Sequence, residues 1–327
     1  MTAVSMVGRE AERQELLLRW SGPRSGGRPD VVLITGAAGI GKSRLAASAV
    51  AAFSPAPAVV LSGAARLHSP APYDWLAAVL SGRDTHDLPV PAGGLAWLAQ
   101  DPHAPNERYA PEALLRLAVR TVRALVGTGP AVLVVEDLHA LDPASLNLIG
   151  ELATAPGLPA LLLVTSRLPD SADSPELVAR TLARLSGAPG AIRQHLPPLG
   201  TAEIAGIIAQ VHGDVPAQLA AAVRERTGGN PYWLVELLAA TAGRDAAALL
   251  REPLPGHLRT AATPEPADLT AREQEVLGCL AAGMSNKQMA RELDISIRTV
   301  AVHVSNLLRK TGSASRTEAA LWAVRRG

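Results

Sequence analysis

The sequence predicts an α/β fold, a parallel sheet with helices on both faces and a helical lid, followed by a small all-α domain of four helices. Two observations lead to this fold class. Between positions 1 and 170, short apolar runs without polar alternation are separated by segments of helical periodicity, a pattern typical of parallel strands buried on both faces. Between positions 268 and 327 only helical signals are present, and helix-start motifs recur.

In the first part, the apolar runs predict strands at 31–35, 58–61, 131–135 and 160–165. Helical periodicity predicts helices at 42–53 and 111–126. From about position 176 no further strand is predicted, and four segments have helical character: 176–186, 201–211, 216–226 and 232–242. We therefore expect a core domain at 1–175 and a helical lid at 176–245.

Composition limits the class of protein. The 327 residues hold 31 Lys and Arg, 30 Asp and Glu, and 48% hydrophobic residues, which excludes global disorder and suggests two domains. Cys279 is the single cysteine, so a disulfide scaffold is excluded. Neither a signal peptide nor an apolar run of about 18 residues is present, and a cytoplasmic protein is expected. The net charge of +1 argues against a uniformly basic nucleic-acid binder but allows one basic module.

A glycine-rich loop follows the first predicted strand and opens a helix. Residues 36–43 (GAAGIGKS) match the phosphate-binding pattern G-x-x-x-x-G-K-[ST], which predicts a P-loop NTPase sheet that binds ATP and Mg²⁺. Backbone N–H groups would surround a phosphate, the Lys42 ammonium would reach the β- and γ-phosphates, and the Ser43 hydroxyl would ligate Mg²⁺. The alternative is a chance Gly-rich turn. The predicted nucleotide-binding residues of this loop are Gly36, Ala37, Ala38, Gly39, Ile40, Gly41, Lys42, Ser43 and Arg44.

Charged residues follow two later strands. Glu136 and Asp137 end the strand at 131–135, where a Mg²⁺-side acid and a water-orienting acid are expected. Because the longer Glu comes first, its contact with Mg²⁺ could be indirect. Arg167, after the next strand, is predicted to sense the γ-phosphate. The alternatives are a solvated turn for the two acids and a surface ion pair for Arg167. His139 and Asp142 are treated as loop residues, with a functional role left open.

The C-terminal part begins after a Pro-containing linker predicted at 246–267. Three S/T-x-x-E/Q capping boxes fix helix starts at Thr270, Ser285 and Ser315, and a hydrophobic staple marks a fourth start at Ser296. The four predicted helices of the domain at 268–327 are 270–282, 285–293, 296–311 and 315–325. The short connection between the second and third helices predicts a helix-turn-helix.

The third of these helices has the pattern of a DNA recognition helix. Val300, Val304, Leu307 and Leu308 form its predicted buried stripe, so the opposite face would enter a major groove. The domain carries nine Lys and Arg against six Asp and Glu, a net charge of +3, so the segment 1–267 carries −2. A protein-interaction module is the alternative. The predicted DNA-contacting residues are Asn286, Lys287, Arg298, Thr299, Ala301, Val302, Ser305, Asn306, Arg309 and Lys310.

These residues carry a family resemblance. Residues 269–324 resemble a LuxR-type helix-turn-helix over nearly its whole length, and residues 1–245 resemble the AAA/STAND-type ATPase of the large ATP-binding LuxR-family regulators. The segments that match are VGRE at 7–10, GAAGIGKS at 36–43, LVVEDLHALD at 133–142, LLLVTSR at 161–167 and GGNPYWLVELL at 228–238. The resemblance implies that Val7, Gly8, Arg9 and Pro231 flank the adenine. It also implies a homodimer on double-stranded DNA through residues 316–324.

The chain departs from the family pattern in two places. The large regulators have a long helical-repeat sensor region between the two domains, whereas only the linker at 246–267 stands here, so sensing through repeats is not expected and the effector is unknown. Ala301 and Ser305 replace basic or polar residues of many recognition helices, which favours thymine-methyl contacts and a modest sequence preference.

The leading hypothesis is a transcriptional regulator in which the nucleotide state of the P-loop domain controls the DNA-binding module. A slow ATPase recruited to DNA and a shortened regulator that binds nucleotide only for stability are the alternatives.

Overall fold

The computed structural model describes residues 7–21, 27–64, 71–101, 103–104, 109–167, 174–252, 271–282, 284, 286–295, 299–300, 303–304 and 307. The chain divides into two compact units, Met1–Pro255 and Gly256–Gly327, and each is described by itself. The division falls within the predicted linker at 246–267.

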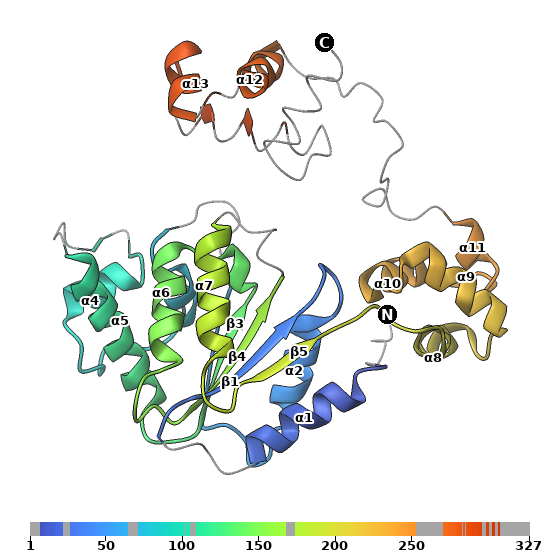
Figure 1. Cartoon of the computed structure of the whole chain (residues 1–327), viewed down its shortest axis with the longest axis horizontal. Coiled ribbons are helices and arrows are strands. Elements are labelled where there is room, and N and C mark those ends of the chain that lie inside the picture. The colour runs from blue at the N-terminus through green and yellow to red at the C-terminus, as the bar shows by residue number, and fades with distance from the viewer. Residues whose placement is uncertain are drawn as a thin grey trace. The chain divides into compact units, whose positions relative to one another are not determined.

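A five-stranded sheet in the order β2-β3-β4-β1-β5 forms the centre of the first unit (Figure 1). The strands are β1 (Asp30–Thr35), β2 (Val59–Ala64), β3 (Ala131–Glu136), β4 (Ala160–Ser166) and β5 (Ile192–His195). All four pairings are parallel. The α/β class and the four predicted strands are confirmed, and β4 lies between the strand before the glycine loop and the strand that ends in the two acids.

Helices cover both faces of this sheet, because alternate strand residues enter two separate cores. Val32 and Ile34 pack with Leu45 under α1 (Glu10–Ser21) and α2 (Lys42–Ala52). Val31 and Leu33 belong to the larger core on the other face. The helices on that face are α3 (Asp74–Leu80), α4 (Ala92–Leu98), α5 (Pro111–Val126), α6 (Pro143–Leu152) and α7 (Pro175–Ser186).

Three helices and a short fourth form a separate core at the end of the first unit. They are α8 (Thr201–His212), α9 (Ala217–Thr227), α10 (Pro231–Ala240) and α11 (Ala248–Arg251). Ile204, Val223, Leu234 and Leu249 are fully buried together there. We call this group of helices the lid.

The prediction that strands end before position 176 is wrong, because β5 pairs with β1. This edge strand has four residues, IRQH, of which only Ile192 is apolar, so it produces no buried run. The helix α7 packs its Val178 and Leu185 into the core of the sheet, and the lid begins with α8. The helix α11 lies in the predicted linker but buries Leu249 in the lid core; a helix this short is too small to reveal a period.

The second unit contains α12 (Ala271–Ala281) and α13 (Asn286–Glu292), at the first two predicted helices. Val300, Leu307 and Met289 are fully buried in its core, with Val304 packed against them, and Cys279 is buried there too. Leu308 and the caps Thr270, Ser285, Ser296 and Ser315 lie outside the described residues, as does the predicted helix 315–325. In the part of the chain that the structure describes, no helix is both long and apolar enough to span a membrane.

Asp142 joins two helices on one face of the sheet. It caps α6, where its Oδ1 accepts from the N–H groups of Ala144 (2.9 Å) and Ser145 (3.0 Å). The same carboxylate accepts from the N–H groups of Tyr73 and Asp74, both at 3.1 Å, at the start of α3. Asp142 is buried, so its charge is compensated by four backbone donors. This answers the question that the sequence left open for Asp142 with a structural role.

The substitution Asp142→Ala is expected to lower the free energy of unfolding by about 3 kcal/mol, because buried N–H groups lose charged acceptors. Denaturant unfolding followed by circular dichroism measures this loss. The control is Glu151→Ala, which removes a half-exposed ion pair with Arg184 and should cost less than about 1 kcal/mol. Equal losses in the two variants would contradict the role of Asp142.

Candidate functional site

The glycine loop connects the end of β1 to the start of α2 and turns tightly. Gly39 has a φ of +72°, in the left-handed region that favours glycine. A Cβ on Gly39 would lie 2.7 Å from the Cβ of Tyr232 and 3.0 Å from Oδ1 of Asn230. Both the backbone conformation and the approach of the lid therefore require glycine at this position.

Lys42 is buried at the first turn of α2. Its Nζ donates to the carbonyl oxygens of Gly36 (3.1 Å) and Ala37 (2.9 Å) in its own loop. Burial lowers the pKa of Lys42, an effect opposed by the negative charge of Asp137 and reinforced by the positive charge of Arg167. An added phosphate would supply the negative charge that this buried ammonium needs.

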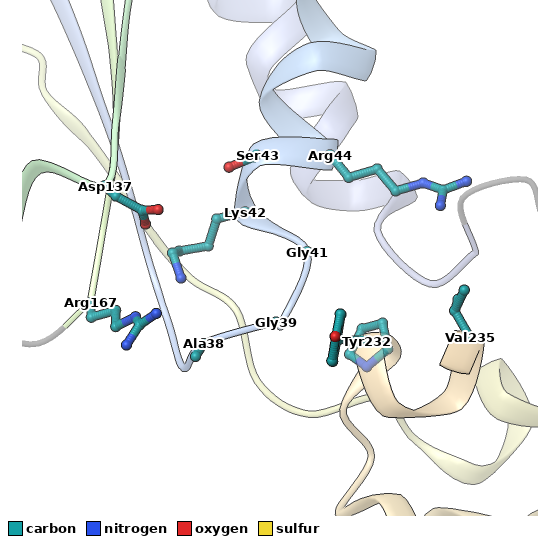
Figure 2. A pocket seen from close by; sticks show the side chains of 11 residues that line it. Ala38, Gly39, Gly41, Lys42, Ser43, Arg44, Asp137, Arg167, Tyr232 and Val235 are labelled. Carbon is teal, nitrogen blue, oxygen red and sulfur yellow. The ribbon is translucent and has the colours of Figure 1, made fainter. Parts of the chain in front are cut away.

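A cavity of about 320 Å³ opens on the loop (Figure 2). Asp137 and Arg167 lie on one side of it and Tyr232 and Val235 on the other, with the loop between them. One end thus carries Asp137 and Arg167, and the other carries Tyr232 and Val235 with the side chain of Arg44 extending toward it (Figure 2). The lining residues are Ala38, Gly39, Gly41, Lys42, Ser43, Arg44, Asp137, Arg167, Pro231, Tyr232 and Val235.

The two acids occupy different positions. Asp137 lines the cavity and has a φ of +48°, and its N–H donates to Oγ1 of Thr165 on β4 (3.0 Å). Glu136 is the last residue of β3 and is absent from the cavity wall. By strand alternation Glu136 shares a face with Val132 and Val134, which pack into the core under α2. Asp137 therefore lies on the cavity wall, whereas Glu136, the acid predicted to hold Mg²⁺, lies on the face of β3 that packs under α2.

Arg167 follows β4 directly and presents its side chain to the cavity (Figure 2). Its Nε is buried and has no hydrogen-bond partner among the described residues. Within the same residues no carboxylate forms an ion pair with Arg167. The described residues therefore contain no acidic partner for the alternative interpretation, in which Arg167 forms a surface ion pair.

The lid contacts the glycine loop through the first turn of α10. Nδ2 of Asn230 donates to the carbonyl oxygen of Ala38 (2.8 Å), and Oδ1 of Asn230 accepts from the N–H of Tyr232 (3.0 Å). The same N–H of Tyr232 is 3.3 Å from the carbonyl oxygen of Gly39. Asn230, Tyr232 and Val235 were not predicted as site residues, although the GGNPYWLVELL segment that pointed to Pro231 contains all three.

The structure does not bring Val7, Gly8 and Arg9 to the cavity wall. A Cβ on Gly8 would collide with the side chain of Glu203 at the start of α8. Arg9 is buried and donates to the carbonyl oxygen of Pro197, in the connection between β5 and α8. These residues attach the N-terminal segment to the base of the lid, and their contact with adenine stays a prediction. Gly36, Ala37 and Ile40 belong to the loop without lining the cavity.

For the predicted DNA interface, the structure describes few residues. Thr299 is helical and half-buried. Asn286 and Lys287 begin α13, but their side chains lie outside the description. Arg298, Ala301, Val302, Ser305, Asn306, Arg309 and Lys310 also lie outside the described residues. Their DNA contacts stay predictions.

The parallel sheet, the loop at 36–43 and the acid after β3 define a P-loop ATPase core. A family model described as AAA ATPase domain matches residues 5–164, and one described as bacterial regulatory proteins, luxR family, matches residues 267–323. The chain thus has an N-terminal AAA ATPase domain and a C-terminal domain of the luxR family of bacterial regulatory proteins. The resemblance seen in the sequence is confirmed for both parts.

Curated relatives match short stretches of the chain. The monoamine regulon transcriptional regulator of Klebsiella aerogenes is 51% identical over 53 residues, which are 16% of this chain and 23% of the relative. The nitrate/nitrite response regulator protein NarL of Escherichia coli K12 is 50% identical over 54 residues, 16% and 25% of the two chains. The HTH-type transcriptional regulator MalT of Yersinia pestis is 47% identical over 57 residues, 17% and 6%. The matches cover at most a quarter of the length of these three relatives.

Two solved structures align over most of the chain. A STAND protein with a tetratricopeptide repeat sensor from Pyrococcus horikoshii is 17% identical, with a TM-score of 0.43, over 98% of this chain and 48% of that one. The ORC1 protein of Aeropyrum pernix in complex with DNA is 15% identical, with a TM-score of 0.47, over 98% and 93%. Likenesses this weak carry no argument about function.

The substitution Gly39→Ala is expected to weaken ATP binding by about tenfold or more, because the loop and the lid must move apart. Titration with a fluorescent ATP analogue measures the affinity. The control is Gly157→Ala in the turn before β4, where φ is +70° and a Cβ would meet open space. That variant bears a similar backbone penalty, of about 1 kcal/mol, yet should bind ATP like the parent. Equal affinities in the two variants would contradict the contact between loop and lid.

Proposed function

We propose that this protein is a transcriptional regulator that binds ATP with Mg²⁺ and whose nucleotide state controls DNA binding by its LuxR-type domain. The observation that carries the proposal is the pair of contacts from Asn230 and Tyr232 to the glycine loop. Through them, a change in the loop reaches α10 directly. The AAA ATPase and luxR family matches on one chain supply the two activities to be coupled.

Among the described residues, two cations that line the cavity match the negative charge of ATP. Lys42 is a buried cation held only by loop carbonyls, and Arg167 has a buried Nε without a partner in the described structure. Both would gain from the negative charge of a triphosphate. The loop N–H groups and the start of α2 would hold the β-phosphate, and Arg167 would contact the γ-phosphate.

The remaining site residues take roles that follow from their positions. Ser43 and Glu136 would hold Mg²⁺, which when bound neutralises charge between the β- and γ-phosphates. Asp137, on the cavity wall, would orient a water molecule. Pro231, Tyr232 and Val235 line the end where the base would lie, and Arg44 extends toward the same end. Val7, Gly8 and Arg9 would approach the base only after the lid moves, because they are packed at its foot.

The C-terminal domain would bind double-stranded DNA in the cytoplasm. Its net charge of +3 would favour phosphate contacts and make the affinity strongly dependent on salt. Arg298 and Arg309 are the cations proposed on the base-reading face. Residues 316–324 would form the contact between two copies bound to a two-fold symmetric site.

A slow ATPase recruited to DNA is the second candidate function, and Asp137 on the cavity wall favours it. Phosphate release discriminates the two functions. Turnover that DNA stimulates well above the rate of a switch supports the enzyme, whereas a DNA affinity that changes with nucleotide supports the regulator. Equal DNA affinity with ATP and with ADP indicates nucleotide bound only for stability.

The substitution Lys42→Ala is expected to abolish nucleotide binding, because the phosphates lose their buried cation, while DNA binding persists without a response to ATP. Selection from a random DNA pool by the full chain, with ATP, ADP or no nucleotide, identifies a bound sequence. Fluorescence anisotropy on that sequence then measures each affinity.

The control is Arg28→Ala, which removes one exposed cation just before β1, at the opposite end of the strand from the loop. This variant should bind ATP and respond to it like the parent. Normal ATP binding by the Lys42→Ala variant would refute the assignment of the site. Parent DNA affinities that are identical with ATP, with ADP and without nucleotide would refute nucleotide control.

A further inference from the structure

Two side-chain hydrogen bonds join the carboxyl ends of β3 and β4. The backbone pairing of the two strands ends at Val135 and Val164. Beyond that point, the N–H of Asp137 donates to Oγ1 of Thr165 (3.0 Å), and the N–H of Arg167 donates to Nδ1 of His139 (3.2 Å). His139 belongs to a short 3₁₀ turn after the two acids, η1 (Leu138–Ala140). The second bond therefore connects this turn to the backbone of Arg167, whose side chain lines the cavity.

His139 is buried, with 6% of its surface exposed, and it lies on η1, which packs against β4 and α7. Because Nδ1 accepts a hydrogen bond from the Arg167 backbone, the ring carries no proton at this nitrogen. Oδ1 of Asp137 lies 3.9 Å from the same Nδ1. One imidazole thus adjoins both residues that line the charged end of the cavity.

This bond is one of two side-chain contacts to the Arg167 backbone, because Oγ of Ser166 also donates to the Arg167 carbonyl oxygen (2.8 Å). Among the described residues, its Nε has no partner and no carboxylate holds its guanidinium. The placement of the side chain is therefore set by its backbone, which lies beyond the β3–β4 ladder and directly follows Ser166, the last residue paired with β1. The His139 ring accepts from that backbone at the point where the side chain turns toward the cavity.

We propose that His139 is a positioning residue for Arg167, and that through it His139 sets how strongly the site prefers ATP to ADP. This inference rests on the proposed function, in which Arg167 contacts the γ-phosphate. A phosphate-binding role that depends on position is sensitive to small shifts, so loss of the His139 acceptor lowers the affinity for ATP more than that for ADP. A role in packing alone would change both affinities together.

The test compares replacements that separate packing from hydrogen bonding. His139→Leu fills the space without an acceptor, whereas His139→Asn places an amide oxygen near the position of Nδ1. We expect His139→Leu to lower ATP affinity about tenfold with little change for ADP, and His139→Asn to bind both like the parent. His139→Gln, whose amide extends toward the Nε2 position, should behave like His139→Leu and replaces it if the apolar variant does not fold.

Isothermal titration of the full chain with ATP·Mg²⁺ and with ADP·Mg²⁺ measures both affinities. The benchmark is Arg167→Ala, which should lose the preference for ATP, and adding His139→Leu to it should produce no further loss. An unchanged ATP preference in both acceptor-free variants, with the preference lost in Arg167→Ala, overturns the role of His139 and leaves the proposed function intact. Equal losses for ATP and ADP also overturn it. A parent chain that binds neither nucleotide overturns the proposed function itself.

Discussion

The candidate site depends on the parallel pairing of β3, β4 and β1. In a parallel sheet all carboxyl ends meet at one edge, and here β4 pairs with β3 on one side and β1 on the other. The register aligns Thr35 with Ser166, so the glycine loop and Arg167 start from neighbouring points. Asp137 follows β3 at the same edge. Three segments that are far apart in the sequence thus share one cavity without any loop having to cross the sheet.

The lid adds a second constraint, because its helix α10 closes the other side of the same cavity. The contact is polar, made by Asn230 and the N–H of Tyr232 to loop carbonyls. Such a contact can form and break at small cost, since water replaces its hydrogen bonds. In the proposed function, the bound nucleotide changes the position of the lid through this contact. The charge distribution, −2 over 1–267 and +3 over 268–327, separates the nucleotide and DNA roles along the chain.

The sequence predicted what depends on local pattern. The strands β1, β3 and β4 are buried on both faces and appear as apolar runs. The loop at 36–43 matches a sequence motif that specifies a phosphate-binding turn between a strand and a helix. The strand β5 was missed because its four residues include only one apolar side chain. Asn230, Tyr232 and His139 stand in segments that the sequence singled out, but their partners, the glycine loop and the backbone of Arg167, are tertiary contacts that those segments do not reveal. Val7, Gly8 and Arg9 were expected beside the adenine base, yet they do not line the cavity. Arg9 instead donates a hydrogen bond to the carbonyl oxygen of Pro197, just before the lid.

In the proposed function, one nucleotide contacts the glycine loop and the lid together. Amide hydrogen exchange of the full chain, with and without ATP·Mg²⁺, tests it most directly, because peptides covering 36–44 and 230–240 report the two sides separately. We expect slower exchange in both peptides when ATP binds, and no change in a peptide covering α4 at 92–98. Slower exchange in the loop peptide alone, with the 230–240 peptide unaffected, would contradict it.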